Sequence, residues 1–386
     1  MIPAGDWTLD IGGVVNAYYT STSYSGDNGP AGVLGLGSGD QDTTNNITTG
    51  LLPNYLSVSG KTRQNDLDVA FTISINPGAS TTNGGIQGSN QENRQAFLTF
   101  GDASWGSIKL GKDLGIYASD AILNDMTLLG VGGGAGSLAG NTTTVGRIGS
   151  GFMYADWKSQ VAYTSPNWNG FDFTVGVTQS WNAVGNALGN DFGSANSTGR
   201  GGSSPAFEGK ASYAWTGDVA GKVWASFISQ KVDGLETDVS TPVALGDDRA
   251  TAFDIGTTVN IAGLGLTAYY GNGDGIGQTH QLYDGFDSTG KSRDSDQWYV
   301  QATYVLPTTT KVGVSYGEST LDGNSIDTFD SAEDSMWTIG AYHPITKHLN
   351  LVAEYSEAER DRDNNGSIAD VKAKAKTISL GAILFF

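Results

Sequence analysis

The chain has 386 residues, of which 40 are acidic and 21 are Lys or Arg, so its formal net charge is −19. Such an acidic chain lacks the basic surface that binds nucleic-acid phosphates, and we expect no nucleic-acid partner. The absence of cysteine excludes disulfide scaffolds, thiolate zinc sites and cysteine nucleophiles. Apolar residues make up only 38 % of the chain, whereas Gly reaches 56 residues and aromatic residues 10 %, which is unusual for a soluble domain.

No segment predicts a membrane-spanning helix, because a helix that crosses a bilayer needs about 20 mostly apolar residues. The long charge-free stretch Met126–Gly146 is rich in Gly and includes Asn141 and three consecutive threonines. The amino terminus has no basic segment followed by an apolar run, so no signal peptide is predicted. We expect either a protein that stays in the cytoplasm or a mature form in which a Met replaces the leader.

Strict alternation of apolar and polar residues recurs from the amino-terminal part onward and predicts half-buried strands. In Leu67–Ile75, Leu, Val, Phe and two Ile residues share one face, and Asp, Ala, Thr and Ser share the other. The same pattern is found in Phe171–Thr178, Trp298–Leu306 and Leu349–Ser356. The chain is therefore predicted to be all-β.

Turn-rich linkers between these windows fall into two length classes that interleave. Seven short turns and eight long loops imply sixteen strands, with the turns at one edge and the loops at the other. This arrangement predicts a transmembrane antiparallel β-barrel that forms one domain over residues 1–386. The long loops are expected at Ser21–Pro53, Gly78–Glu92, Leu114–Trp157, Trp181–Pro205, Leu235–Asp248, Gln278–Ser295, Asp322–Glu333 and Arg362–Asp370.

The polar faces of the predicted strands favour a water-filled interior over a soluble sandwich or barrel. They consist mostly of Gly, Ser, Thr, Asn and Asp, which are too small and too polar to fill a barrel of sixteen strands. The apolar faces should then contact lipid, with aromatic residues such as Tyr213, Trp215 and Trp337 near the headgroups. The chain ends on Phe386, which shares a face with Ile378, and this terminal strand resembles that of outer-membrane proteins.

The segment from Arg94 to Lys112, followed by Tyr117 and Asp120, resembles the trimeric general-diffusion porins of Gram-negative bacteria. It has the form R-x-A-x-x-x-L followed by G-x-x-x-x-G-K, and Val145–Gly149 is similar to the V-G-R-x-G motif of that family. The resemblance implies a long third loop, about residues 114–157, that folds into the lumen and narrows it. It also implies a homotrimer in the outer membrane, in contact with lipid and lipopolysaccharide, that passes small hydrophilic solutes.

In that family, acidic residues of the inward loop face basic residues of the barrel wall. Carried over by position, Asp120 and Asp125 are the loop acids, and Arg94 and Arg147 are two of the wall positions. Two other basic positions of the family fall near Gly13 and Tyr55, and the P-E-F-G-G motif of the loop tip is missing. Replacement charge on the lumen face is expected from Lys61, Arg63 and Lys109. The predicted constriction thus contains Asp120, Asp125, Arg94, Arg147, Lys61, Arg63, Tyr55 and Lys109.

Two further groups of residues near the carboxyl terminus give weaker predictions. Lys372, Lys374 and Lys376 share the outward face of Ile378, and we expect them near lipopolysaccharide phosphates, a neighbouring subunit or solvent. Asp361, Asp363 and Asn365 match the first half of an EF-hand calcium loop, but Lys372 occupies the position of its final acid. The alternative is a simple hairpin loop with an Asn-Gly turn, and no other cofactor is expected.

No catalytic constellation emerges from the three scattered His residues or from the acidic residues, so no enzymatic activity is expected. We predict an outer-membrane porin for passive diffusion. The alternatives are a channel that prefers an organic acid or oligosaccharide, and a barrel that serves as a surface adhesin or structural anchor. Lumen-facing charges nearly balance, which predicts mild selectivity, tipped towards cations at low salt by the acidic loops.

Overall fold

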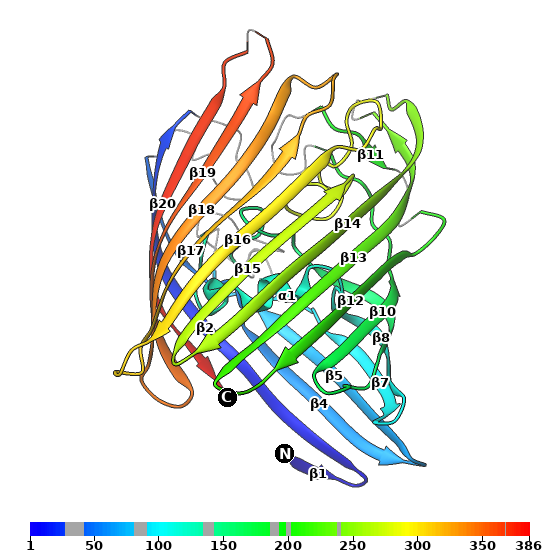
Figure 1. Ribbon diagram of the computed structural model, residues 1–386, viewed down its shortest axis with the longest axis vertical. Helices are drawn as coiled ribbons and strands as arrows, with labels where there is room; N and C mark the ends of the chain where they lie inside the picture. Colours follow the sequence, from blue (N-terminus) through cyan, green and yellow to red (C-terminus); the bar gives the residue numbers. More distant parts are fainter. Residues whose placement is uncertain are drawn as a thin grey trace.

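The computed structural model describes residues 1–27, 42–80, 91–133, 143–185, 193–197, 202–237, 241–366 and 368–386, and this part is dominated by β-strands (Figure 1). It contains four short strands, β1 (Ile2–Ala4), β3 (Thr43–Thr48), β6 (Gln91–Glu92) and β11 (Asn196–Ser197), and two short helices, α1 (Ser119–Asn124) and η1 (Met126–Leu129). The sixteen longer strands are β2 (Trp7–Gly26), β4 (Tyr55–Gln64), β5 (Leu67–Pro77), β7 (Ala96–Asp102), β8 (Gly106–Leu114), β9 (Trp157–Thr164), β10 (Phe171–Thr178), β12 (Ala206–Trp215), β13 (Val219–Glu236), β14 (Ala244–Ile261), β15 (Leu264–Asp274), β16 (Asp294–Val305), β17 (Lys311–Asp322), β18 (Phe329–Pro344), β19 (Leu349–Asn364) and β20 (Val371–Phe385).

Antiparallel pairing of each long strand with the next produces a closed barrel. The first long strand, β2, pairs with β4 along its first half and with the last strand, β20, along its second half. The β2–β20 register places Val14 opposite Phe385 and Gly26 opposite Ala373. An even number of strands lets the first and last meet in antiparallel orientation, so the predicted sixteen-stranded barrel is confirmed.

The period-two alternation of the sequence separates an apolar outer face from the lumen face. On β13, for example, Val223 and Phe227 point outward and are 37 % and 47 % exposed, whereas the residue after each of them, Trp224 and Ile228, is buried. Exposed large apolar residues occur on most of the long strands, among them Ile11, Ile73, Leu98, Leu110, Val161, Val175, Phe207, Ile255, Leu266, Val300, Val314, Ile339, Leu351 and Leu380. An apolar outer band around a polar interior is the arrangement expected of a barrel in a membrane. None of the described helices is long and apolar enough to cross a membrane.

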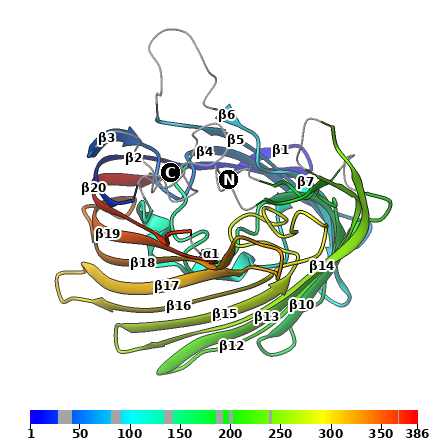
Figure 2. The same ribbon diagram turned by 90° about the horizontal axis from the view of Figure 1, so that it is seen from above.

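The buried core lies between the barrel wall and a long segment that folds inside the barrel. Figure 2 shows α1 within the ring of strands. This segment, residues 115–156 between β8 and β9, is called the inward loop, and residues 134–142 of it lie outside the described part. Its residues Ile148 and Phe152 pack with Trp224 and Tyr299 of the wall in one hydrophobic cluster. The predicted loop 114–157 therefore does enter the lumen.

Several predicted loops are shorter than the sequence suggests, because the strands beside them continue further. The predicted loop Asp322–Glu333 is reduced to residues 323–328 between β17 and β18, and Ser21–Pro53 contains the end of β2 and all of β3. The alternation of inward and outward residues persists where the strands continue, but the outward residues there are mostly polar, so the sequence predicts loops at these positions. All residues outside the described part fall within six of the eight predicted loops.

Candidate functional site

The inward loop is fixed at its base by a carboxylate of the barrel wall. Glu208 of β12 accepts hydrogen bonds from the backbone N–H groups of Ile116 and Tyr117, at 2.8 and 2.9 Å. The same carboxylate forms a buried ion pair with Lys158 of β9, with an N–O distance of 2.6 Å. The two ends of the loop also meet directly, where the Gly115 N–H donates to the Asp156 carbonyl at 2.7 Å. These bonds direct the chain from β8 into the lumen.

The short helix α1 presents Asp120 to two lysines of the wall. Lys210 of β12 lies 3.1 Å from one carboxylate oxygen, and Lys222 of β13 is bound to the other. Asp120 is 5 % exposed, whereas the two lysines are 26 % and 31 % exposed. Burial alone would raise the pKa of the Asp120 carboxyl, but the charges of Lys210 and Lys222 outweigh it and lower the pKa below its ordinary value.

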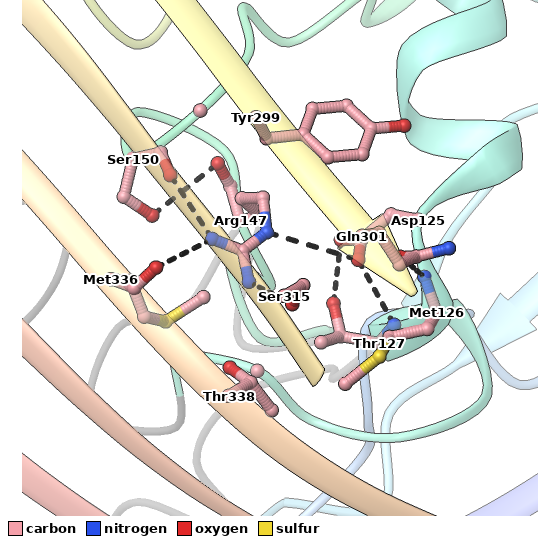
Figure 3. Close-up of polar contacts among 12 residues, drawn as sticks. Asp125, Met126, Thr127, Arg147, Ser150, Tyr299, Gln301, Ser315, Met336 and Thr338 are labelled. Carbon is pink, nitrogen blue, oxygen red and sulfur yellow. Dashed lines mark hydrogen bonds and ion pairs between the residues drawn. The ribbon is translucent and has the colours of Figure 1, made fainter. Parts of the chain in front are cut away.

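Asp125, only five residues further along, occupies a different environment. It begins the helix η1, where its carboxylate accepts hydrogen bonds from the N–H and hydroxyl of Thr127 at 3.0 and 2.6 Å. Its second partner is Arg147 on the returning half of the loop, with 4.0 Å between Nε and the carboxylate. Both side chains are fully buried. Figure 3 shows the Arg147 guanidinium extended towards β17 and β18, where it donates to the Met336 carbonyl at 2.7 Å and contacts the Ser315 hydroxyl.

The described part of the loop tip is bound to the opposite side of the barrel. Glu354 of β19 accepts hydrogen bonds from the backbone N–H groups of Val131 and Gly132, at 2.7 and 2.9 Å, and from the Tyr342 hydroxyl at 2.6 Å. The Tyr18 hydroxyl of β2 donates to the Leu129 carbonyl at 2.8 Å. From β12 through to β19 and β2, therefore, the inward loop follows the wall. On the β4 to β8 side, Tyr55 at the start of β4 packs against the loop tip, and the hydrogen bonds named above involve none of these strands.

The two arginines predicted on the opposing wall do not line an open passage. Arg147 belongs to the loop itself and is buried, together with Asp125, where the loop packs against the wall. Arg94 precedes β7 and is 3 % exposed, paired with Glu92 at 2.9 Å and positioned over the Trp157 ring. Both guanidiniums face protein groups rather than the lumen, so their placement on an open charged wall is wrong. The sequence motif found the positions but could not show which way they face.

The other predicted constriction residues lie on the lumen face at different depths. Lys109 of β8 is 30 % exposed and pairs with Asp113, which is 11 % exposed. Arg63 lies at the turn end of β4, where it pairs at 2.9 Å with both Asp68 and Asp102. Lys61, two residues before it, is exposed. Lys61 and Arg63 line a cavity of about 780 Å³ at the short-turn edge.

Tyr55, the first residue of β4, is partly buried and packs against the hydrophobic cluster that contains Tyr18 of β2 and Val131 of the loop tip. It thus lies beside the loop tip and away from Asp120, whose partners are on β12 and β13. The predicted set of eight residues is therefore spread over three places: the base of the loop, its seat on the wall, and the lumen face of β4 and β8.

The predicted calcium loop is not formed by the described residues. Asp361 and Asp363 lie on the extended strand β19, and Asp361 is paired with Lys372. The amide of Asn365 donates to the Asp327 carbonyl at 2.9 Å. No group of three or more His, Asp or Glu residues with a geometry suited to a metal occurs within the part of the chain that the structure describes.

The three outward lysines of β20 face acidic residues of the neighbouring strand β19. Lys374 lies 2.9 Å from Glu359, and Lys376 lies 3.9 Å from Glu357. The lysines are between 39 % and 61 % exposed and alternate with buried residues of β20. Contact with lipopolysaccharide phosphates stays a prediction, because each lysine already has a carboxylate partner.

No local sequence signal connects Lys210, Lys222 and Glu208 with the inward loop. Asp120 is separated from Lys210 by 90 residues and from Lys222 by 102. No local pattern marks such a pair, because the partners meet only after the loop has folded inward. The name eyelet is given to Asp120 with its partners Lys210 and Lys222, together with Lys109 and Leu123, which line one cavity with Lys210.

The chain matches one protein-family model over nearly its whole length. Residues 4–364 match the model described as Gram-negative porin. A search of curated protein sequences gave no significant match.

Solved structures show the same fold at low sequence identity. An anion-selective porin from Comamonas acidovorans has a TM-score of 0.61 at 14 % identity, covering 98 % of this chain and 100 % of that one. The outer membrane channel DcaP of Acinetobacter baumannii has a TM-score of 0.65 at 15 % identity, with 99 % of both chains covered. The trimer form of OmpT, an outer membrane protein of Vibrio cholerae, has a TM-score of 0.57 at 16 % identity, covering 98 % and 99 %.

Proposed function

The chain belongs to the Gram-negative porin family and is an outer-membrane channel for passive diffusion, and we propose that its eyelet favours small anionic solutes and that it works as a homotrimer. Family membership also excludes an enzymatic role, as the sequence predicted. The cavities beside the inward loop favour conduction over a surface adhesin or structural anchor.

The proposed anion preference rests on which charges of the eyelet are exposed to water. Lys109, Lys210 and Lys222 are each 26–31 % exposed, whereas their partners Asp113 and Asp120 are 11 % and 5 % exposed. Three ammonium groups therefore face two largely covered carboxylates. A passing solute meets the basic groups first, and a narrow passage lined with low-dielectric walls strengthens their field. This sign is opposite to the mild cation preference expected from the net charge of the chain.

Reversal potentials across a planar bilayer with a salt gradient test the preference. The wild-type channel should favour chloride over potassium, and the double variant Lys210→Gln/Lys222→Gln should lose most of that preference. A unit charge at about 4 Å is worth about 1 kcal/mol in water, so each lysine should change the permeability ratio by about fivefold. Lys374→Gln is the matched control, because Lys374 is 39 % exposed on the outer surface. A wild-type preference for potassium would overturn the proposal.

The homotrimer is supported by the uneven height of the barrel wall. β7, β9 and β10 contain 7, 8 and 8 residues, whereas β17 to β20 contain 12 to 16. A tilted strand needs about 9–11 residues to cross the hydrocarbon layer. The part of the barrel formed by β7, β9 and β10, called the low wall, is therefore too short to span this layer on its own. A neighbouring subunit would cover the apolar outer residues of this wall, among them Val161 and Val175. The solved trimer form of the Vibrio cholerae protein, which has the same fold, agrees with this arrangement.

The oligomeric state in detergent tests this arrangement. Val161→Arg puts a charge on the low wall and should convert the trimer to monomers, measured by light scattering after gel filtration. Val314→Arg is the control, because Val314 is equally exposed, at 50 % against 49 %, but lies on the tall strand β17. That variant should stay trimeric. Monomers in the wild type, or trimers in both variants, would contradict the proposed interface.

A further inference from the structure

An apolar side chain projects into the water-filled eyelet from the end of α1. Leu123 is 53 % exposed, whereas Ala121 and Ile122 before it are buried against the wall. The helix is held in this rotation because the Tyr299 hydroxyl donates to the Ala121 carbonyl at 3.0 Å. Leu123 borders two cavities, of about 290 and 400 Å³, and therefore lies where they adjoin. Its exposure in the lumen is thus built into the position of the helix.

The larger of these cavities combines an apolar side with a basic side. Leu114, Leu123 and Trp157 contribute apolar surface, and Lys109 and Lys210 contribute ammonium groups. The cavity also contains the amide side chains of Gln95 and Gln160. Its volume of about 400 Å³ is within the range of about 300–1,000 Å³ that small-molecule sites occupy.

We propose that this cavity is a weak binding site for small monoanions that carry an apolar group, such as aromatic carboxylates. The carboxylate would contact Lys109 and Lys210, and the ring would cover Leu123 and the exposed part of Trp157. A single charge fits best, because each lysine is already partly neutralised, by Asp113 and Asp120 respectively. The aromatic ring stabilises the complex because its burial removes apolar surface of both the solute and the cavity from water. Binding is weak because a solute that crosses a channel has to leave the site again.

The inference rests on the proposed anion preference and makes it more specific. A basic eyelet without an apolar side would bind acetate and benzoate with similar affinity, apart from the effect of their size. A basic eyelet with an apolar side should retain benzoate longer. The two acids have the same charge and the same carboxylate, so the difference between them isolates the contribution of Leu123 and its apolar neighbours.

Single-channel recordings with three probes test the site. Benzoate should interrupt the current of the wild-type channel in a concentration-dependent way, whereas acetate and benzylammonium should not. Leu123→Asn keeps the side-chain size but removes the apolar surface, and should weaken the benzoate effect by about tenfold, at the lower end of the range for a lost apolar contact. Leu123→Met should retain it. Ile326→Asn is the matched control, because Ile326 is 49 % exposed outside the barrel lumen, in residues 323–328.

The outcomes separate this inference from the proposed function. Leu123→Asn removes no charge, so the variant should still prefer chloride over potassium while its benzoate effect falls, and the mobility shift of unheated samples on gels shows whether it is folded. Lys109→Gln should weaken both the anion preference and the benzoate effect. Equal effects of acetate and benzoate on the wild type, with chloride preferred, would overturn the site and leave the anion preference intact. A preference for potassium would overturn the proposed function itself.

Discussion

Two acidic residues of the same loop, Asp120 and Asp125, have different roles because they differ in access to water. Asp120 is bound to lysines that are partly exposed, so its charge belongs to the solute path. Asp125 and Arg147 are fully buried, so their charges hold the loop against the wall. The family resemblance placed both acids in the constriction, because both fall on the inward loop at positions carried over from the family. Which of them faces water depends on packing that local sequence does not encode.

Replacing each acid by its amide should separate these roles. Asp125→Asn leaves the Arg147 charge buried without its partner, which typically costs about 3–5 kcal/mol, so the loop should loosen and the conductance should fluctuate. Asp120→Asn should cost about 1 kcal/mol or less, because Lys210 and Lys222 can be hydrated, and should shift the reversal potential further towards anions. Thermal unfolding and single-channel recordings measure the two effects. The double variant Asp125→Asn/Arg147→Gln should recover part of the lost stability, and equal behaviour of the two single variants would refute the distinction.

Among the elements, the number and pairing of the strands could be predicted from the sequence, but the residues at which they end on the long-loop edge could not. Period-two alternation is a local property, and it survives in each strand because one face contacts apolar surroundings and the other water. At the loop ends of β19 and β20 the outward residues become charged, with Glu357, Glu359 and Lys374 facing one another across the strands. These residues satisfy the strand geometry but lose the apolar signature, so the predicted strand window ends at Ser356, whereas β19 continues to Asn364.

The junction of the first and last strands should be sensitive to a side chain at Gly13. Gly13 exchanges backbone hydrogen bonds with Phe386 at 3.0 and 3.1 Å. A Cβ atom at Gly13 would collide with the Tyr55 carbonyl oxygen and would lie 2.8 Å from the Phe386 ring. Gly13→Ala should therefore impair closure and lower the yield of folded barrel, measured by the mobility shift of unheated samples on gels. At Gly12 the added atom would meet only the Phe386 carbonyl oxygen, at 3.0 Å, so Gly12→Ala should fold better. Equal yields would show that the strands can separate at this point.

For the whole molecule, the sequence predicted the barrel far better than the site inside it. The closure of sixteen strands follows from repeated local patterns together with the need to pair every backbone group in a membrane. The seat of the inward loop depends instead on contacts such as Val131 with Glu354, which are 223 residues apart. The sign of the proposed selectivity likewise depends on contacts between residues that are far apart in the sequence. A net charge of −19 describes the chain, but only a few charges, with particular exposures, border the eyelet.

The orientation of the barrel in the membrane follows from its two unequal edges and can be tested with single cysteines. The chain has no cysteine of its own, so each introduced thiol is unique. Ser288→Cys lies in the segment between β15 and β16 at the long-loop edge, and Lys347→Cys lies in the turn between β18 and β19, and both positions are exposed. Porins have long loops outside the cell and short turns in the periplasm, so a polyethylene glycol maleimide too large for the eyelet should label Ser288→Cys on intact cells. Lys347→Cys should react only after the outer membrane is permeabilised. The reverse pattern would invert the assigned orientation, and equal labelling in intact cells would show that the reagent had crossed the membrane.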